Sequence, residues 1–192
     1  MTATASPALA EAIAFASAHE TPWPRDPRAD PQRFGVHIED PPPWNRLLGP
    51  LHARGPQGGV VWQHGTEIAA WGDPSRADQT FSVAKTYLAL LAGVAQRQGL
   101  LPDVDRPVVA QLPGIGFDGA HNAPITWRHL LTQVSEWEGN CLGLSEQADR
   151  WRKVGQDPRP AAGRKGDARP LQSPGTYWEY NDVRINQLSL AL

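Results

Sequence analysis

Ser82 and Lys85 lie three residues apart in the segment Phe81-Ser-Val-Ala-Lys85. Residues at this spacing share one face of a helix, so the lysine ammonium group can reach the serine hydroxyl one turn earlier. A serine beside a basic group is an arrangement typical of nucleophilic attack on acyl carbon. Burial would lower the pKa of Lys85 toward that of a useful base, and the N-terminus of the helix would offer N–H groups to an oxyanion.

The same pair also has a structural interpretation. Ser82 can cap the helix, and Lys85 can extend its ammonium group to solvent. The local sequence leaves both interpretations open.

Two neighbouring elements must position this pair. Residues 81–99 predict a helix that is apolar nearly all round, hence buried, with Gly99 as its stop signal. Before it, residues 58–72 contain two short apolar runs that flank His64-Gly65, which predicts a β-hairpin.

Two further helices are predicted near the C-terminus, and loops occupy much of the remaining chain. One helix begins with Thr126 as its N-cap and continues through Val134, and another starts at Trp178 and continues to Leu192. Residues 150–169 carry seven basic and two acidic side chains among Pro and Gly. This segment is either a solvated surface loop or an anion-binding patch.

The N-terminal part differs in composition. Residues 7–18 predict a short helix, whereas the repeated prolines of residues 20–57 exclude long helices and central strands and predict an ordered or semi-ordered wrap. Because no Lys or Arg precedes Arg25, the start does not resemble a secretory signal. We therefore expect a cytoplasmic protein.

Composition excludes several classes of protein. With 192 residues, 40% hydrophobic and 20% charged, the chain can bury a core and is not a charge-driven disordered protein. A net charge of −2 gives no support for nucleic-acid or anionic-membrane partners, and no apolar run is long enough to span a bilayer. The single cysteine, Cys141, excludes a disulfide framework and a cysteine-based zinc site. No motif for a phosphate, dinucleotide or metal is present, so no cofactor and no metal are expected.

Three segments in order resemble the motifs of a known family. They are residues 81–85, residues 125–131 with Ser135 after them, and Tyr180-Asn-Asp182. This order is similar to that of the serine hydrolases related to class C β-lactamases, DD-peptidases, their esterase relatives and nylon-oligomer hydrolases. The resemblance covers roughly residues 58–192.

The resemblance implies a mechanism and a fold. Ser82 would attack an acyl carbon, Lys85 would help to deprotonate it, and Tyr180 would be the phenol that shuttles the proton. A neighbouring cation is needed for this role, so we expect the Tyr180 hydroxyl within hydrogen-bond reach of Ser82 or Lys85. The implied fold class is α/β (α+β): an antiparallel sheet flanked by helices, with a mainly helical lobe inserted after the helix of residues 81–99.

The sequence departs from this family at two points. Asp182 replaces the usual Asn that touches substrate; a carboxylate there could bind a cationic group, orient Lys85 or line the wall, and it counts against a β-lactam substrate. The family's third motif, a Lys or His followed by x-Gly on a strand, would lie after Leu192. We therefore expect an N-terminal helix and wrap at residues 1–57, and at residues 58–192 the N-terminal portion of a hydrolase domain.

Other candidate residues have weaker support. Trp137 is predicted to bind substrate, and the neighbouring Glu136 and Glu138 either edge the cleft or lie in a solvated loop. His64, His121 and His129 are predicted to have structural roles.

The favoured interpretation is a hydrolase that forms an acyl-enzyme on a small-molecule ester or amide. The alternative is a non-catalytic truncated homologue, or one half of a split protein. An isolated two-stranded ribbon is marginal in water and leaves a sheet edge unpaired. On this basis the 192 residues alone are expected to be inactive, and either poorly soluble or bound to a complementary C-terminal chain or to further copies.

Overall fold

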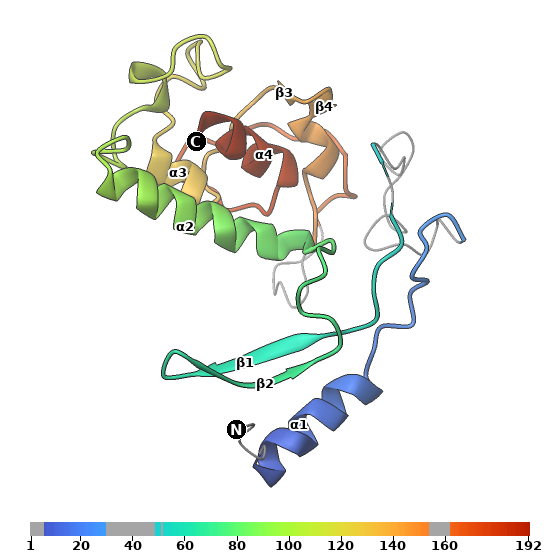
Figure 1. The fold of residues 1–192 in the computed structure, drawn as a ribbon. Coiled ribbons are helices and arrows are strands. Elements are labelled where there is room, and N and C mark those ends of the chain that lie inside the picture. Colours follow the sequence, from blue (N-terminus) through green and yellow to red (C-terminus); the bar gives the residue numbers. More distant parts are fainter. Residues whose placement is uncertain (1–5, 30–48, 51, 154–161) are drawn as a thin grey trace. The chain divides into compact units, whose positions relative to one another are not determined.

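The structure, a computed structural model, describes residues 6–29, 49–50, 52–153 and 162–192 (Figure 1). The chain divides into two compact units, Met1–Thr80 and Phe81–Leu192. This division falls after the predicted hairpin. Much of the predicted proline-rich wrap lies outside the described residues.

The first unit contains one helix and one hairpin among its described residues. Helix α1 (Pro7–Ala18) begins at Ser6, whose hydroxyl accepts a hydrogen bond from the Leu9 N–H. Strands β1 (Gly59–Gln63) and β2 (Thr66–Trp71) pair antiparallel. The two residues between them, His64 and Gly65, both have positive φ, as a tight hairpin turn requires. The predicted hairpin is therefore confirmed.

The second unit combines helices with one small antiparallel sheet, and the two units together confirm the predicted α/β class. Its described elements in chain order are the 3₁₀ helix η3 (Phe81–Val83), α2 (Ala84–Arg97), η4 (Val108–Ala110), α3 (Trp127–Leu131), β3 (Asn140–Cys141), β4 (Leu144–Ser145), η5 (Glu146–Asp149) and α4 (Asp182–Ala191). Helix α4 contacts α3, β3 and η5 (Figure 1). In the described residues, no helix has both the length and the apolar character that crossing a membrane requires.

The core of this unit joins α2, α3 and α4 to the loops between them. Its buried apolar side chains are Ala92, Leu101, Val108, Phe117, Ile125, Trp127, Leu130, Trp137, Cys141, Val183, Leu188 and Ala191. Because α4 supplies three of these side chains, burial of its inner face anchors the segment that immediately precedes it.

Helix α2 is less buried than its composition predicts. Of its described residues Ala92 alone is buried, whereas Leu90 and Leu91 are 64% and 57% exposed. The predicted burial of the whole helix is wrong, because only one of its faces packs on the core. Its end is as predicted, since Gly99 adopts a positive φ just after the C-cap.

The two shorter helices differ from the predictions at one end each. Thr126 caps α3 as predicted, by accepting from the His129 N–H, but the helix stops at Leu131 because Gln133 leaves the helical region with a φ of +59°. Helix α4 starts at Asp182 rather than Trp178, since the Asn181 side chain caps it. The residues just before α4 therefore stay outside the helix.

Candidate active site

Ser82 lies in the 3₁₀ turn that leads into α2, and Lys85 lies in the first turn of α2. Ser82 is exposed to solvent, while Lys85 is partly buried. The helical spacing places Lys85 Nζ 3.1 Å from Ser82 Oγ, where the ammonium group donates a hydrogen bond to the hydroxyl oxygen. The predicted contact across one helical turn is confirmed.

Tyr180 reaches the same hydroxyl from the segment just before α4. Its Oη lies 2.5 Å from Ser82 Oγ, although the two residues are 98 positions apart in the chain. Lys85 Nζ also lies 4.6 Å from the centroid of the Tyr180 ring. The expected hydrogen-bond distance between Tyr180 and Ser82 is thus confirmed.

Asp182, the first residue of α4, carries a carboxylate that joins two cations. Its Oδ1 lies 2.5 Å from Lys85 Nζ, and its Oδ2 accepts a hydrogen bond from the Arg152 guanidinium. Of the roles that the sequence left open for Asp182, contact with Lys85 is the one that this geometry supports.

These ion pairs shift the pKa of Lys85 in the direction opposite to the one expected. Burial disfavours its charged form, but the hydrogen bond and the negative charge of Asp182, together with Tyr180, outweigh it and raise the pKa of Lys85. Burial likewise opposes ionisation of Asp182, but Arg152 and Lys85 hold the pKa of Asp182 below its usual value. The predicted lowering of the pKa of Lys85 is therefore wrong, because the partner carboxylate was not part of that prediction.

Together with Arg152, these side chains form what we call the cluster: Ser82, Lys85, Arg152, Tyr180 and Asp182. The sequence did not indicate Arg152 as a member. Its guanidinium carbon lies 5.0 Å from the Tyr180 ring centroid, and its Nη1 lies 3.1 Å from a carboxylate oxygen of Asp149. Lys165 binds the other oxygen of Asp149 at 2.9 Å. In the described parts of residues 150–169, several basic side chains therefore make ion pairs within the protein, and neither sequence interpretation anticipated this.

A second set of charged side chains is buried. Each of the six side chains is at most 9% exposed: Glu136, Glu146, Arg150, Arg169, Glu179 and Arg184. Glu136 binds Arg169 at 2.6 Å and Arg184 at 2.5 Å, and Arg169 also binds Glu179 at 2.7 Å. We call these six residues the buried charge network.

This network holds the segment that carries Tyr180. Glu179 belongs to it directly and accepts a hydrogen bond from the Trp151 N–H at 2.9 Å. On the other side of Tyr180, the Asn181 amide donates to the Glu146 carbonyl at 2.9 Å. Tyr180 is therefore fixed on both sides along the chain, which limits the positions that its hydroxyl can take.

The structure does not bring Trp137 to the cluster. Trp137 is 1% exposed, packs against Phe117, and donates its indole N–H to the Gly116 carbonyl at 2.6 Å. In this position its ring is part of the core and offers no surface to a substrate. Glu136 is fully buried, so it neither edges a cleft nor lies in a solvated loop, whereas Glu138 is exposed.

Two of the three histidines make hydrogen-bond contacts within the protein, and the third lies in a turn. His64 occupies the hairpin turn, His121 Nε2 lies 2.9 Å from the Glu136 carbonyl oxygen, and His129 Nδ1 accepts from the Thr126 N–H. Among the described residues, no group of three or more side chains is placed to hold a metal ion.

Replacing Glu136 by Gln is expected to lower the free energy of unfolding by about 3–5 kcal/mol, because the guanidinium groups of Arg169 and Arg184 would lose their shared buried carboxylate. Glu138→Gln is the matched control, since it makes the same change two residues away at an exposed position. Chemical unfolding of both variants measures the difference. Equal stabilities of the two variants would contradict the role assigned to the network.

Comparison with models of protein families places most of the chain in a known family. Residues 44–192 match the family described as Beta-lactamase. This range includes both ends of the cluster, from Ser82 on η3 to Asp182 on α4. No curated protein and no solved structure matches the chain significantly.

Proposed function

The chain belongs to the Beta-lactamase family of serine hydrolases, and from this premise we propose that it forms an acyl-enzyme on Ser82. The observation that carries the proposal is the pair of contacts at Ser82 Oγ, with Tyr180 Oη at 2.5 Å and Lys85 Nζ at 3.1 Å. An exposed hydroxyl between a phenol and an ammonium group has the partners that nucleophilic catalysis needs.

In the proposed acylation, Ser82 Oγ forms a bond to the carbonyl carbon of the substrate. The proton leaves Oγ for the coupled pair of Tyr180 and Lys85, which must have lost one proton beforehand to accept it. The pair then returns this proton to the departing oxygen or nitrogen, whose bond to the carbonyl carbon breaks. Water releases the acid from Ser82 in a second step of the same kind.

The proposed substrates are small-molecule esters or amides, because both present a carbonyl carbon and a leaving atom that takes up a proton. The ionised Asp182 close to the nucleophile counts against β-lactams. No cofactor is needed for this chemistry, since the proposed steps use only protein side chains and water.

A fluorophosphonate probe tests the proposal, because it reacts with an activated serine much faster than with an ordinary one. We expect the intact protein to take up one label, on the peptide that contains Ser82. The chain has eight serines, so the others serve as internal controls, and heat-denatured protein controls for non-specific reaction. A label on another serine, or no label at any protein concentration, would contradict the assignment.

The exposed apolar side chains on α2 favour a second candidate, in which the protein acts only with a complementary chain or further copies. Leu90 and Leu91 are both exposed on α2, the helix that begins beside Ser82. In that case labelling of Ser82 would increase with protein concentration or on addition of the partner. Labelling independent of both would exclude it.

A further inference from the structure

The carboxylate of Asp182 is shared between two cations rather than reserved for one. Oδ1 contacts Lys85 and Oδ2 contacts Arg152. Because Lys85 also donates to Ser82 Oγ, Arg152 is linked to the nucleophile through Asp182 and Lys85. A charge placed in this way acts on Lys85 through Asp182.

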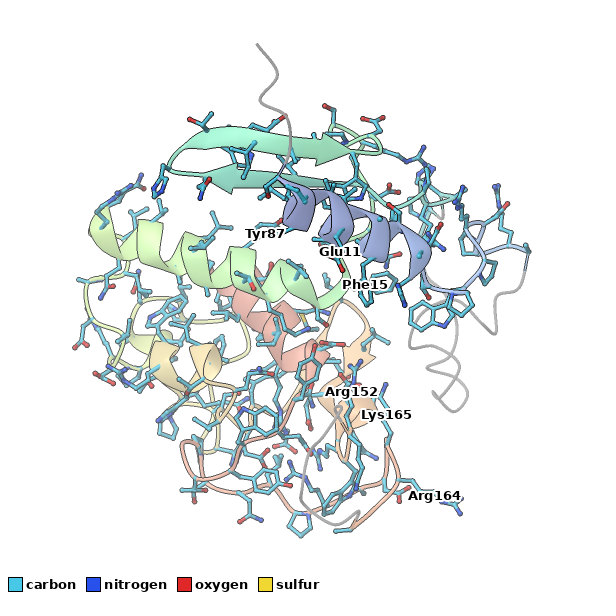
Figure 2. All side chains as sticks on the ribbon, turned by 90° about the horizontal axis from the view of Figure 1, so that it is seen from below. Glu11, Phe15, Tyr87, Arg152, Arg164 and Lys165 are labelled. Atoms are coloured by element: carbon cyan, nitrogen blue, oxygen red, sulfur yellow. The ribbon has the colours of Figure 1, made fainter. Side chains whose placement is uncertain are left out.

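Arg152 is itself held in place from its other side. Asp149, which is 5% exposed, binds Arg152 at 3.1 Å and Lys165 at 2.9 Å, and it accepts a hydrogen bond from the Asp182 backbone N–H at 2.6 Å. Arg152 and Lys165 accordingly lie close together, while Arg164 extends away from them (Figure 2). One buried carboxylate thus fixes both Arg152 and the start of α4.

Arg152 also faces the second partner of Ser82. Its guanidinium carbon lies 5.0 Å from the Tyr180 ring centroid, close to the 4.6 Å of Lys85 Nζ. Cations at such distances are attracted to the ring. Arg152 therefore contacts Tyr180 directly and reaches Lys85 through Asp182.

We propose that Arg152 is a positioning residue of the hydrolase reaction: it anchors Asp182 so that Lys85 stays within reach of Ser82, and it offsets the charge of Asp182 so that Lys85 can exchange a proton. The inference rests on the proposed function. It goes beyond it in assigning a role to a residue outside the group that moves the proton.

Removing the charge of Arg152 and removing that of Asp182 are expected to shift the pKa of Lys85 in opposite directions. Removing Arg152 leaves the Asp182 charge acting on Lys85 alone, which raises the pKa of Lys85 further. Removing the Asp182 charge leaves Arg152 near Lys85, which lowers the pKa of Lys85. The charged and titratable side chains along this chain of contacts from Lys85 are Tyr180, Asp182, Arg152, Asp149 and Lys165.

The test measures the rate of fluorophosphonate labelling as a function of pH in two variants. The alkaline limb is the part of the pH profile in which the labelling rate rises with pH. For Arg152→Gln we expect this limb to move to higher pH by about one unit, so that the rate at pH 7 falls about tenfold. For Asp182→Asn we expect the limb to move to lower pH. Arg152→Lys keeps the charge and is expected to restore the position of the limb, even where the rate stays lower.

Arg164→Gln is the matched control, because it removes an exposed arginine of the same segment and is expected to leave the profile unchanged. Thermal unfolding of every variant separates loss of fold from loss of positioning. If Arg152→Gln does not fold, Arg152→Lys and Asp182→Asn still test the sign.

A second measurement follows the titration of Lys85 in the absence of any reaction. The chain has three lysines, Lys85, Lys153 and Lys165, so ¹³C-labelled lysine gives three NMR signals that Lys→Arg variants assign. We expect the titration of Lys85 to move up in Arg152→Gln and down in Asp182→Asn. If Ser82 is still labelled but the pKa of Lys85 shifts in the same direction in both variants, or in neither, the inference is overturned. Absence of the label in the parent protein would instead overturn the proposed function.

Discussion

Ser82→Ala is expected to abolish covalent labelling by a fluorophosphonate and to leave thermal unfolding nearly unchanged. The hydroxyl is the atom proposed to attack, so its removal leaves no serine at the site to form the bond. Its removal costs little stability, because Ser82 is exposed and both groups that bind it remain near solvent or have other partners.

Ser189→Ala is the control, since Ser189 is an exposed serine on α4 in the same unit. Mass spectrometry of the intact protein after labelling compares the two variants. Full labelling of Ser82→Ala would disprove the nucleophile assignment, and equal loss in both variants would point to damage of the fold instead.

Lys85→Met is expected to slow acylation by about three orders of magnitude or more, as removal of the partner of an activated nucleophile typically does. Methionine keeps a long unbranched side chain but has no proton to donate or accept. In the unmodified protein the pKa of Lys85 is raised, so the proton-deficient pair becomes populated only as the pH rises. The labelling rate should therefore climb into the alkaline range, and Lys85→Met should lack this climb.

The control for this substitution is Lys153→Met, which removes an exposed lysine close to Arg152 in the chain. The labelling rate is measured over a pH series that runs from neutral into the alkaline range, because a lysine with a raised pKa loses its proton there. An unchanged alkaline limb in Lys85→Met would exclude Lys85 from the proton transfer. A limb lost in both variants would show that the effect is not specific to Lys85.

The elements predicted best are those defined by neighbouring residues. His64-Gly65 indicates the hairpin because two positive φ angles are needed at that turn, and both are found there. Thr126 indicates a helix start, and the spacing of Ser82 and Lys85 indicates a shared helix face. Each of these predictions depends on fewer than five consecutive residues.

Contacts between distant residues could not be predicted in this way. The proximity of Tyr180 to Ser82 came from the resemblance of motif order, not from spacing. The raised pKa of Lys85 depends on Asp182, almost a hundred residues away, and Arg152 stands in a segment whose composition indicates a surface loop. Glu136 likewise has nothing in its local sequence that reveals its two buried guanidinium partners.

The buried charge network has a consequence for how this family can diverge. Three carboxylates and three guanidinium groups balance one another within it, so an exchange at one position alone leaves an unmatched charge in the interior. A joint exchange of matched partners for apolar residues avoids that penalty and can even stabilise a protein. The six positions should accordingly be inherited as a set: descendants of the same ancestor are expected either to keep all the charges or to have lost them in oppositely charged pairs.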